Sequence, residues 1–428
     1  MIIERRAALR GGLGALGLAL AGRAVAAPLL SGRRTGLTVA QASRRNAWLE
    51  IDAAQFERNI SGVRAQIAGS GAELCLIVKA DAYGCGLDLL MPSILRSGAK
   101  TIGLCTNDEA RIARTGGFKG RIVRVRTPLL EEIEDALPLD VQELIGNAEE
   151  ARLLAETLRG RRPGRPLPIH LALNAGGMSR NGLELKTQAA KADALRILSL
   201  LELRIVGLMT HYPTEDADDV RAQLNRYISD VAWLGAQGLS RKGVVRHTAN
   251  SGVTARFPEA RLDMVRVGSF LYGDTEPDFP QFKGVMTLKS RVAAVNFYPA
   301  GETVNYDRTY RLGRDSWLAN LPVGYSDGYR RSLTHANRPE FAAEGRNHTE
   351  VLIGGRRYPV VGRVTMNTMM VDVTDAQGKV RLGDEAVLFG RQGEALIPQA
   401  EIEANASVYG ADFYTLLGNS VPKVLKAS

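Results

Sequence analysis

The sequence is poor in the residues that carry metal, redox and nucleic-acid chemistry. Its 428 residues include only three cysteines and five histidines, and no Cys/His cluster has the spacing of a zinc site. The net charge of +9 is spread without a Lys/Arg block, which argues against a nucleic-acid partner. Hydrophobic residues make up 45% and charged residues 24%, as in an ordinary globular chain. We therefore expect no metal centre, no nucleic-acid partner, and neither a disordered chain nor a polytopic membrane protein.

The apolar stretch near the N-terminus is too short to span a bilayer. It covers residues 11–22, whereas a membrane-spanning helix needs about 20 apolar residues. Arg5 and Arg6 precede it, and the small residues Ala24-Val25-Ala26 follow it. A basic start, an apolar core and small residues in this order are typical of a cleavable export signal. An N-terminal core helix is the alternative, and we expect no stable membrane span.

The few cysteines bear on the export prediction, because an exported chain can oxidise its thiols. Cys75 and Cys105 fall within consecutive runs that are predicted as strands, where the two side chains could face one another. We expect a disulfide between them. Two buried free thiols remain the alternative.

Eight short β-branched runs alternate with helical patterns between about residues 70 and 270. The runs are Glu73–Lys79, Thr101–Thr106, Ile122–Thr127, Val141–Gly146, Pro168–Asn174, Arg204–His211, Val244–Asn250 and Leu262–Gly268. Amphipathic stretches such as Ala148–Leu158, with Asn147 as its N-cap, and Ala217–Leu234 lie between them. This alternation predicts an α/β fold with an N-terminal (β/α)8 TIM barrel. A doubly wound open sheet is the alternative, but no Gly-rich fingerprint follows the first run.

The pattern changes from about residue 281. Short runs with strand character, separated by Gly, Pro, Asn and Asp, predict a C-terminal β-rich domain. The early run Trp48–Asp52 is a candidate to pair into it. The predicted organisation is a signal peptide over 1–26, a linker over 27–46, a barrel over 47–280 and a β domain over 281–428.

Polar residues stand where the predicted barrel strands end, which is where a barrel places its chemistry. A lysine such as Lys79, at a buried strand end, loses solvation, so that its pKa falls and its amine can attack an aldehyde. Ser251, Gly252 and the amides around Gly268 are suited to a phosphate group, and Arg266 is suited to an aromatic nitrogen. Together these features indicate a pyridoxal 5'-phosphate site.

Each of these residues also has a plainer interpretation. A single lysine at a strand end is more often solvated or salt-bridged, and His211 alone is more often a structural hydrogen-bond partner. Arg124 and Arg126 alternate along one strand and point to one face, so that a salt bridge inside a barrel would explain them. Only the combination favours the functional interpretation.

At these residues the sequence resembles the alanine racemase family of pyridoxal phosphate enzymes, over about residues 45–425. The similar motifs are Val78–Gly86, Met209–Tyr212, His247 with Asn250-Ser251, Val265–Gly268, Pro322–Tyr329 and Val361–Asn367. They occur in the family's order along nearly the whole chain after the export signal.

The resemblance implies a role for each matching residue. Lys79 would hold the cofactor and act as one catalytic base, and Tyr306, supplied across a head-to-tail homodimer, would be the second. Further cofactor contacts would come from Tyr83, His211, His247, Ser251, Arg266, Gly268, Ser269 and Tyr414. Arg180, Tyr325 and the backbone amide of Met366 would bind the amino-acid substrate.

One position departs from the usual family pattern, because Leu173 stands where the family has a lysine. In this feature the chain is similar to the broad-specificity amino-acid racemases of the bacterial periplasm. The resemblance implies that specificity depends on Arg124, Arg126, Ala172, Asn174, Gly176 and Asn181. We expect a periplasmic two-base racemase that acts on Lys, Arg, Ala and other amino acids and supplies D-amino acids for cell-wall remodelling. A narrow alanine racemase, a fold-related decarboxylase and a non-catalytic periplasmic binding protein are the alternatives.

Overall fold

The computed structural model describes residues 37–176, 181–274, 279–334 and 349–427. Its first sheet has eight strands in the order β8-β7-β6-β5-β4-β3-β2-β9. These strands are β2 (Glu73–Ile77), β3 (Thr101–Leu104), β4 (Arg121–Arg124), β5 (Val141–Ile145), β6 (Leu167–Ala172), β7 (Leu203–Met209), β8 (Val245–His247) and β9 (Met264–Val267). Each begins within two residues of a run that the sequence predicts as a strand. All of their pairings are parallel.

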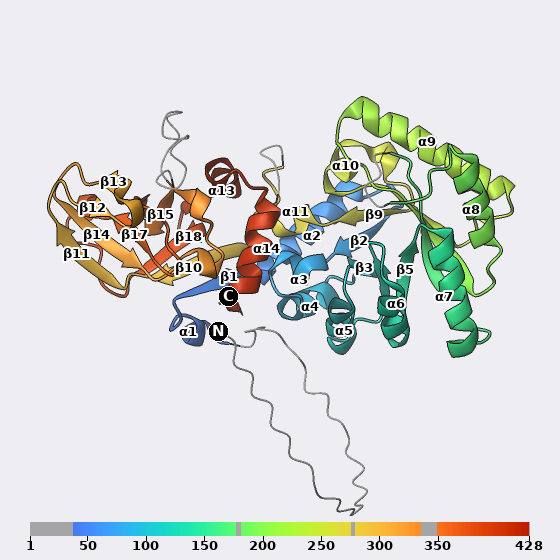
Figure 1. Ribbon diagram of the computed structural model, residues 1–428, viewed down its shortest axis with the longest axis horizontal. Coiled ribbons are helices and arrows are strands. Elements are labelled where there is room, and N and C mark those ends of the chain that lie inside the picture. Colours follow the sequence, from blue (N-terminus) through green and yellow to red (C-terminus); the bar gives the residue numbers. More distant parts are fainter. Residues whose placement is uncertain (1–36, 177–180, 275–278, 335–348, 428) are drawn as a thin grey trace, which may run out of the picture. The chain divides into compact units, whose positions relative to one another are not determined.

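The two ends of this sheet meet and close it. The Asp263 amide donates to the Arg246 carbonyl at 3.1 Å, and the Arg266 amide donates to the Ala249 carbonyl at 3.0 Å. These bonds join the segment of β8 to that of β9, so the predicted TIM barrel is confirmed and the open sheet is wrong. The barrel helices are α2 (Ala53–Ile67), α4 (Leu87–Arg96), α5 (Asn107–Thr115), α6 (Leu130–Ala136), α7 (Ala148–Arg161), α8 (Gln188–Leu198), α9 (Ala217–Ala236), α10 (Ser251–Arg256) and α11 (Ser269–Tyr272) (Figure 1).

Short polar side chains begin the two long helices that the sequence predicts. Asn147 caps α7, and its Oδ1 accepts the backbone amides of Glu149 and Glu150 at 2.9 and 3.0 Å. Asp216 caps α9 in the same way. Each cap satisfies amides that have no partner inside the helix. The Asp216 carboxylate also places negative charge at the positive end of the α9 dipole.

A second, mainly antiparallel sheet follows the barrel in sequence. Its order is β11-β14-β17-β16-β15-β18-β10-β1-β20, and β19 pairs with β18. The strands are β1 (Ala47–Ile51), β10 (Met286–Arg291), β11 (Ala294–Tyr298), β14 (Ser316–Leu321), β15 (Glu350–Ile353), β16 (Arg356–Val361), β17 (Met369–Asp372), β18 (Glu385–Gln392), β19 (Ala395–Ile397) and β20 (Lys423–Leu425). A small hairpin, β12 (Thr303–Val304) with β13 (Tyr310–Arg311), and the helices α13 (Gln399–Ala406) and α14 (Gly410–Ser420) complete this part.

Strand β1 belongs to this second sheet and not to the barrel, as the run at Trp48 predicts. It pairs antiparallel with β10, with Leu49 opposite Leu288, and parallel with β20, with Leu49 opposite Lys423. All five residues of β1 are buried. Just before it, the short helix α1 (Val39–Ala42) packs Ala42 against Trp48. Strand β1, which precedes the barrel in sequence, and strand β20, which follows α14, therefore lie side by side.

The register of the barrel strands contradicts the predicted disulfide. Cys75 lies opposite Thr101 in the β2–β3 pair, and Cys105 is four residues further along the chain. Four strand residues span about 13 Å, whereas bridged cysteines need Cα atoms within about 7 Å. All three cysteines are free thiols, and Cys75 and Cys85 are buried. The prediction of a Cys75–Cys105 bridge is wrong, and the alternative of free thiols describes the structure.

In the part of the chain that the structure describes, no helix is both long enough and apolar enough to cross a membrane. The predicted export signal over 1–26 and the predicted substrate residue Arg180 lie outside the described residues, as does the first half of the predicted linker, 27–36.

Thiol titration checks the cysteine assignment. In denaturant without reductant, we expect three reactive thiols per chain, and a prior reduction step should add none. In the native protein Cys75 should react slowly, because burial raises its pKa to about 12 and only the thiolate is reactive. One thiol per denatured chain, rising to three on reduction, would contradict the assignment.

Candidate active site

A cavity of about 330 Å³ opens at the C-terminal ends of the barrel strands. Seven of the predicted site residues line it, from segments that are far apart in sequence: Lys79, Tyr83, His211, Ser251, Arg266, Gly268 and Ser269. Glu215, Tyr409 and Thr415 line it as well, and the sequence analysis did not single them out. Seven of the nine predicted cofactor residues therefore share one space, and His247 and Tyr414 do not line it.

A left-handed turn presents Lys79 and Tyr83 to this cavity. Residues Ala80 to Tyr83, which follow Lys79 in α3 (Lys79–Tyr83), all have φ close to +55°. This conformation costs non-glycine residues roughly 1–2 kcal/mol each, so it needs support from its surroundings. Asp81 provides it: its amide donates to Glu109 Oε1 at 3.0 Å, its Oδ1 accepts the Leu87 amide at 2.9 Å, and its Oδ2 accepts Lys423 Nζ at 2.7 Å.

Helix α14 holds the same turn from the C-terminal part of the chain. Gly84 has a φ of +81°, and a Cβ on it would lie 2.6 Å from the Tyr414 carbonyl oxygen. A Cβ on Gly418 would lie 2.2 Å from the Gly84 carbonyl oxygen. Only glycine allows this approach of the two backbones. The turn at Lys79 is thus built jointly by the barrel and the last helix.

Hydroxyl and amide groups converge next to this turn. The Gly268 amide donates to Ser251 Oγ at 3.0 Å, and a Cβ placed on Gly268 would lie 2.3 Å from the Tyr83 hydroxyl. Ser269 begins α11 directly after Gly268. Two hydroxyls around an unsubstituted backbone position form a cradle of donors that suits a phosphate group.

Arg266 forms the floor of the cavity and is fixed by acceptors only. Its guanidinium donates to the carbonyls of His247, Thr210 and Thr248 at 2.9, 2.9 and 3.1 Å. It also lies 3.1 Å from Nδ1 of His211 and 3.1 Å from Nδ1 of His247. A guanidinium has no acceptor atom, so both imidazole nitrogens must accept.

This requirement sets the tautomers of a chain of buried side chains. If His247 Nδ1 accepts from Arg266, its proton is on Nε2, which lies 2.7 Å from Nδ1 of His170. His170 Nδ1 then accepts, and its Nε2 donates to Oε1 of Gln142 at 2.9 Å. The donors run in one direction, from Arg266 through both histidines to Gln142, and each histidine is neutral. The sequence analysis named His247 as a cofactor contact but missed His170, which no motif marks.

Burial accounts for the neutral histidines. Loss of solvation lowers the pKa of His170 to about 3, and the positive charges of Arg121 and Arg266 lower it further. Desolvation likewise holds the pKa of His247 well below its ordinary value, and electrostatic interactions with His170 and Arg266 lower it further. Two neutral rings keep the positive charge of this layer on Arg266 alone.

Arg124 and Arg126 do not line the cavity. Arg124 is fully buried, and its guanidinium bonds Glu143 at 2.6 Å and the carbonyl of Cys105 at 2.7 Å. Arg126 binds Glu132 at 2.8 Å. For Arg124 the structure shows the internal salt bridge, with Glu143, that the sequence analysis gave as the plainer interpretation.

The other residues of the predicted specificity segment lie around the end of β6. Ala172 and Asn174 are buried, and Asn174 donates to Glu184 at 2.9 Å. A Cβ on Gly176 would lie 2.0 Å from Gln223 Oε1, while Asn181 is exposed and has a φ of +51°. Leu173 packs in an apolar cluster, where a charged side chain would be desolvated.

Tyr414 points away from the cavity at Lys79. Its hydroxyl donates to Asp274, and burial raises its pKa far above the ordinary value. Tyr409, five residues earlier, lines the cavity instead. Among the described residues of this last segment, Tyr409 and not Tyr414 therefore lines the cavity.

The other three predicted residues of the C-terminal domain are exposed. Tyr306, Tyr325 and Met366 have 69%, 38% and 54% of their surface accessible. None of them lines the cavity at Lys79 of the same chain.

The fold and the site together define a barrel enzyme whose cavity combines a lysine, an arginine and an anion cradle. Comparison with known proteins identifies the family. Residues 51–276 match the N-terminal domain of alanine racemase, and residues 285–425 match its C-terminal domain. The chain belongs to the alanine racemase family, whose members are isomerases.

The chain is also similar to individual members. It is 49% identical over 415 residues to the broad specificity amino-acid racemase of Aeromonas hydrophila subsp. hydrophila, covering 96% of this chain and 97% of that protein. It is 42% identical to the lysine racemase of Proteus mirabilis, over 89% of both chains. Among solved structures, alanine racemase of Bacillus anthracis with bound L-Ala-P has a TM-score of 0.78 at 26% identity, covering 90% of this chain and 95% of that one.

The buried histidine chain predicts a pH-dependent stability. Histidines with a pKa depressed in the folded state add stability above about pH 6.5, and this stability is lost as the pH falls toward 3, because the unfolded chain binds more protons. In His170→Asn, we expect an initial loss of about 1–3 kcal/mol at pH 7. The slope of stability between pH 6.5 and 4 should be shallower by up to about 1.4 kcal/mol per pH unit. Urea unfolding across this range measures both, and equal slopes would contradict the neutral chain.

Proposed function

We propose that this chain is a pyridoxal phosphate-dependent racemase of several amino acids that works in the periplasm as a homodimer. The observation that carries the proposal is the joint placement of Lys79, Arg266 and the Tyr83–Ser251–Gly268 cradle in one cavity. The Lys79 amine matches the aldehyde of the cofactor, and the fixed Arg266 guanidinium matches its ring nitrogen. The cradle of donors matches its phosphate. The described residues therefore fit this group.

The cofactor, when bound, makes the α-hydrogen of an amino acid acidic enough to be removed. Lys79 would hold it through its amine, Tyr83, Ser251 and the backbone at Gly268 would hold its phosphate, and Arg266 would donate to its ring nitrogen. Because Arg266 stays charged and can only donate, it favours an unprotonated nitrogen. This limits the withdrawal of electrons by the ring and disfavours side reactions such as transamination.

Inversion of an α-carbon requires a base on each of its two faces. Lys79 serves one face from within the cavity. Tyr306 of the partner subunit would serve the other, since the same chain exposes Tyr306 on its C-terminal domain, outside the cavity lining.

Broad specificity and a role outside the cytoplasm are supported by relatives and by the sequence. The relatives named broad specificity amino-acid racemase and lysine racemase match nearly the whole chain. Leu173 replaces the usual family lysine, and residues 1–26 have the pattern of an export signal. D-amino acids made in this compartment would be available for cell-wall remodelling.

Chiral chromatography tests the substrate range. Mature protein loaded with pyridoxal phosphate is incubated separately with L-Lys, L-Arg and L-Ala, and the D-isomers are followed over time. We expect D-Lys, D-Arg and D-Ala to form at rates within about one order of magnitude of one another. D-Ala alone would indicate a narrow alanine racemase, and no D-isomer from any of the three would overturn the proposed activity.

The second base is tested by Tyr306→Phe, which removes one hydroxyl from an exposed side chain. We expect racemisation to fall by about 10²–10⁴-fold, the usual contribution of a general base, while the bound cofactor and its visible spectrum remain. Lys79→Ala is the matched control and should lose both turnover and the covalently bound cofactor. Full activity in Tyr306→Phe would place the second base elsewhere.

A further inference from the structure

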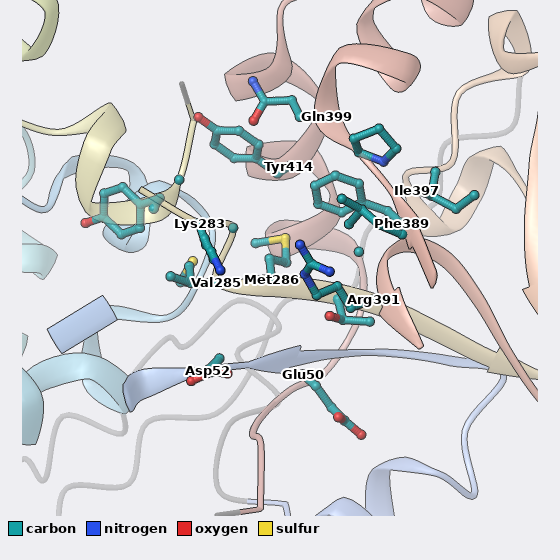
Figure 2. A pocket seen from close by; sticks show the side chains of 18 of the residues that line it. Glu50, Asp52, Lys283, Val285, Met286, Phe389, Arg391, Ile397, Gln399 and Tyr414 are labelled. Atoms are coloured by element: carbon teal, nitrogen blue, oxygen red, sulfur yellow. The ribbon is translucent and has the colours of Figure 1, made fainter. Parts of the chain in front are cut away.

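A second cavity, of about 420 Å³, has only Tyr83 in common with the cavity at Lys79. We call it the rear cavity. Its apolar wall consists of eight buried side chains: Cys85, Tyr272, Phe282, Val285, Met286, Phe389, Ile397 and Tyr414. Figure 2 labels five of them, Val285, Met286, Phe389, Ile397 and Tyr414. A volume and an apolar lining of this kind suit a small organic ligand.

Two cations are directed into the rear cavity. Lys283 and Arg391 are exposed residues that line it, and Figure 2 shows their charged ends pointing toward one another across Met286. Within the ranges that the structure describes, neither has a carboxylate partner. Two like charges aimed at one space repel each other, and an anion between them would turn this repulsion into attraction.

The carboxylates of the rear cavity are already paired within the protein. Glu50 binds Lys289 at 2.9 Å, and Asp52 binds Lys426 at 3.1 Å. Asp274, behind the wall, accepts from the hydroxyl of Tyr414 and from the amide group of Gln399. The charge left for a ligand is therefore positive.

The rear cavity is held in shape by buried polar contacts. The fully buried side chain of Asn59 accepts the amide of Lys283 at 3.2 Å and donates to the carbonyl of Lys283 at 2.9 Å. Arg391 is fixed by its position in the β18–β19 hairpin, opposite Leu396. Both cations thus project from anchored backbone, so that little ordering is needed when a ligand binds.

We propose that the rear cavity is a binding site for a small amphipathic monocarboxylate. The carboxylate would lie between Lys283 and Arg391, and the apolar body would pack against Met286 and Phe389. A free amino acid fits poorly, because its ammonium group would meet two cations. The site is distinct from the proposed racemase site and does not depend on that activity.

Tyr83 connects the two cavities. Its ring stacks on Tyr272 with centroids 4.5 Å apart, and its hydroxyl reaches Gly268 in the cradle. A ligand in the rear cavity would contact the ring whose hydroxyl belongs to the phosphate cradle. The site therefore has a physical route to the bound cofactor, although its occupation can be measured without turnover.

Isothermal titration calorimetry of the protein loaded with pyridoxal phosphate tests the site. The probe is 3-phenylpropionate, and the matched ligands are 3-phenylpropanol, which is neutral, and 2-phenylethylamine, which is cationic. We expect one equivalent of the anion per chain and at least about tenfold weaker binding of the other two. Lys283→Gln and Arg391→Gln should each weaken the anion about fivefold, as expected for a partly exposed ion pair.

Two further variants locate the bound probe. Lys119→Gln removes an exposed lysine of the barrel outside the rear cavity and should leave the affinity unchanged. Ala400→Trp adds bulk to an exposed residue of the lining and should abolish binding while leaving racemisation intact. The proposal is overturned if the anion does not bind, if the amine binds equally well, or if the Lys283/Arg391 double variant retains full affinity. Displacement of the probe by racemic alanine would place it in the racemase site and overturn the proposal as well.

Discussion

The carboxylate of Asp81 is the constraint on which the candidate active site depends. Four successive residues in the left-handed region cost several kcal/mol by themselves, and Lys79 reaches the cavity only because this turn persists. Asp81 binds a backbone amide and Lys423 through its two oxygens, and its own amide is held by Glu109. Removal of one member of such a buried pair leaves an uncompensated charge, at a cost of about 3–5 kcal/mol.

This constraint joins parts of the chain that are more than 300 residues apart. Lys423 begins β20, and β20 pairs with β1 at the entry to the barrel. Gly84 and Gly418 bring the turn and α14 into backbone contact. The second sheet is therefore part of the scaffold of Lys79, and a barrel without it would lose the support of the turn that carries Lys79.

Arg266 is the second constraint on the site, because a guanidinium cannot accept a hydrogen bond. Every neighbour must present an acceptor, and three carbonyls and two imidazole nitrogens do so. The neutral histidines follow from this requirement and from burial, which act in the same direction. The result is a fixed cation at the base of a cavity whose cradle also donates, and this explains why the site suits an anionic cofactor.

The sequence predicts the features that follow from hydrophobic periodicity and from the positions of strand ends. It does not predict contacts that depend on the register of a strand or on the exact start of a helix. Alternating runs locate all eight barrel strands, and the polar residues at their ends include most of the cavity lining. Cys75 lies in β2 and Cys105 directly follows β3, but the sequence does not give the register of the two strands, and Thr101 is the residue opposite Cys75. Likewise, Tyr409 is the N-cap of α14 and Tyr414 lies within it, and the position at which the helix begins decides that Tyr409 lines the cavity and Tyr414 does not. His170 has no motif because its role depends on a tautomer, which is set by an arginine almost one hundred residues away.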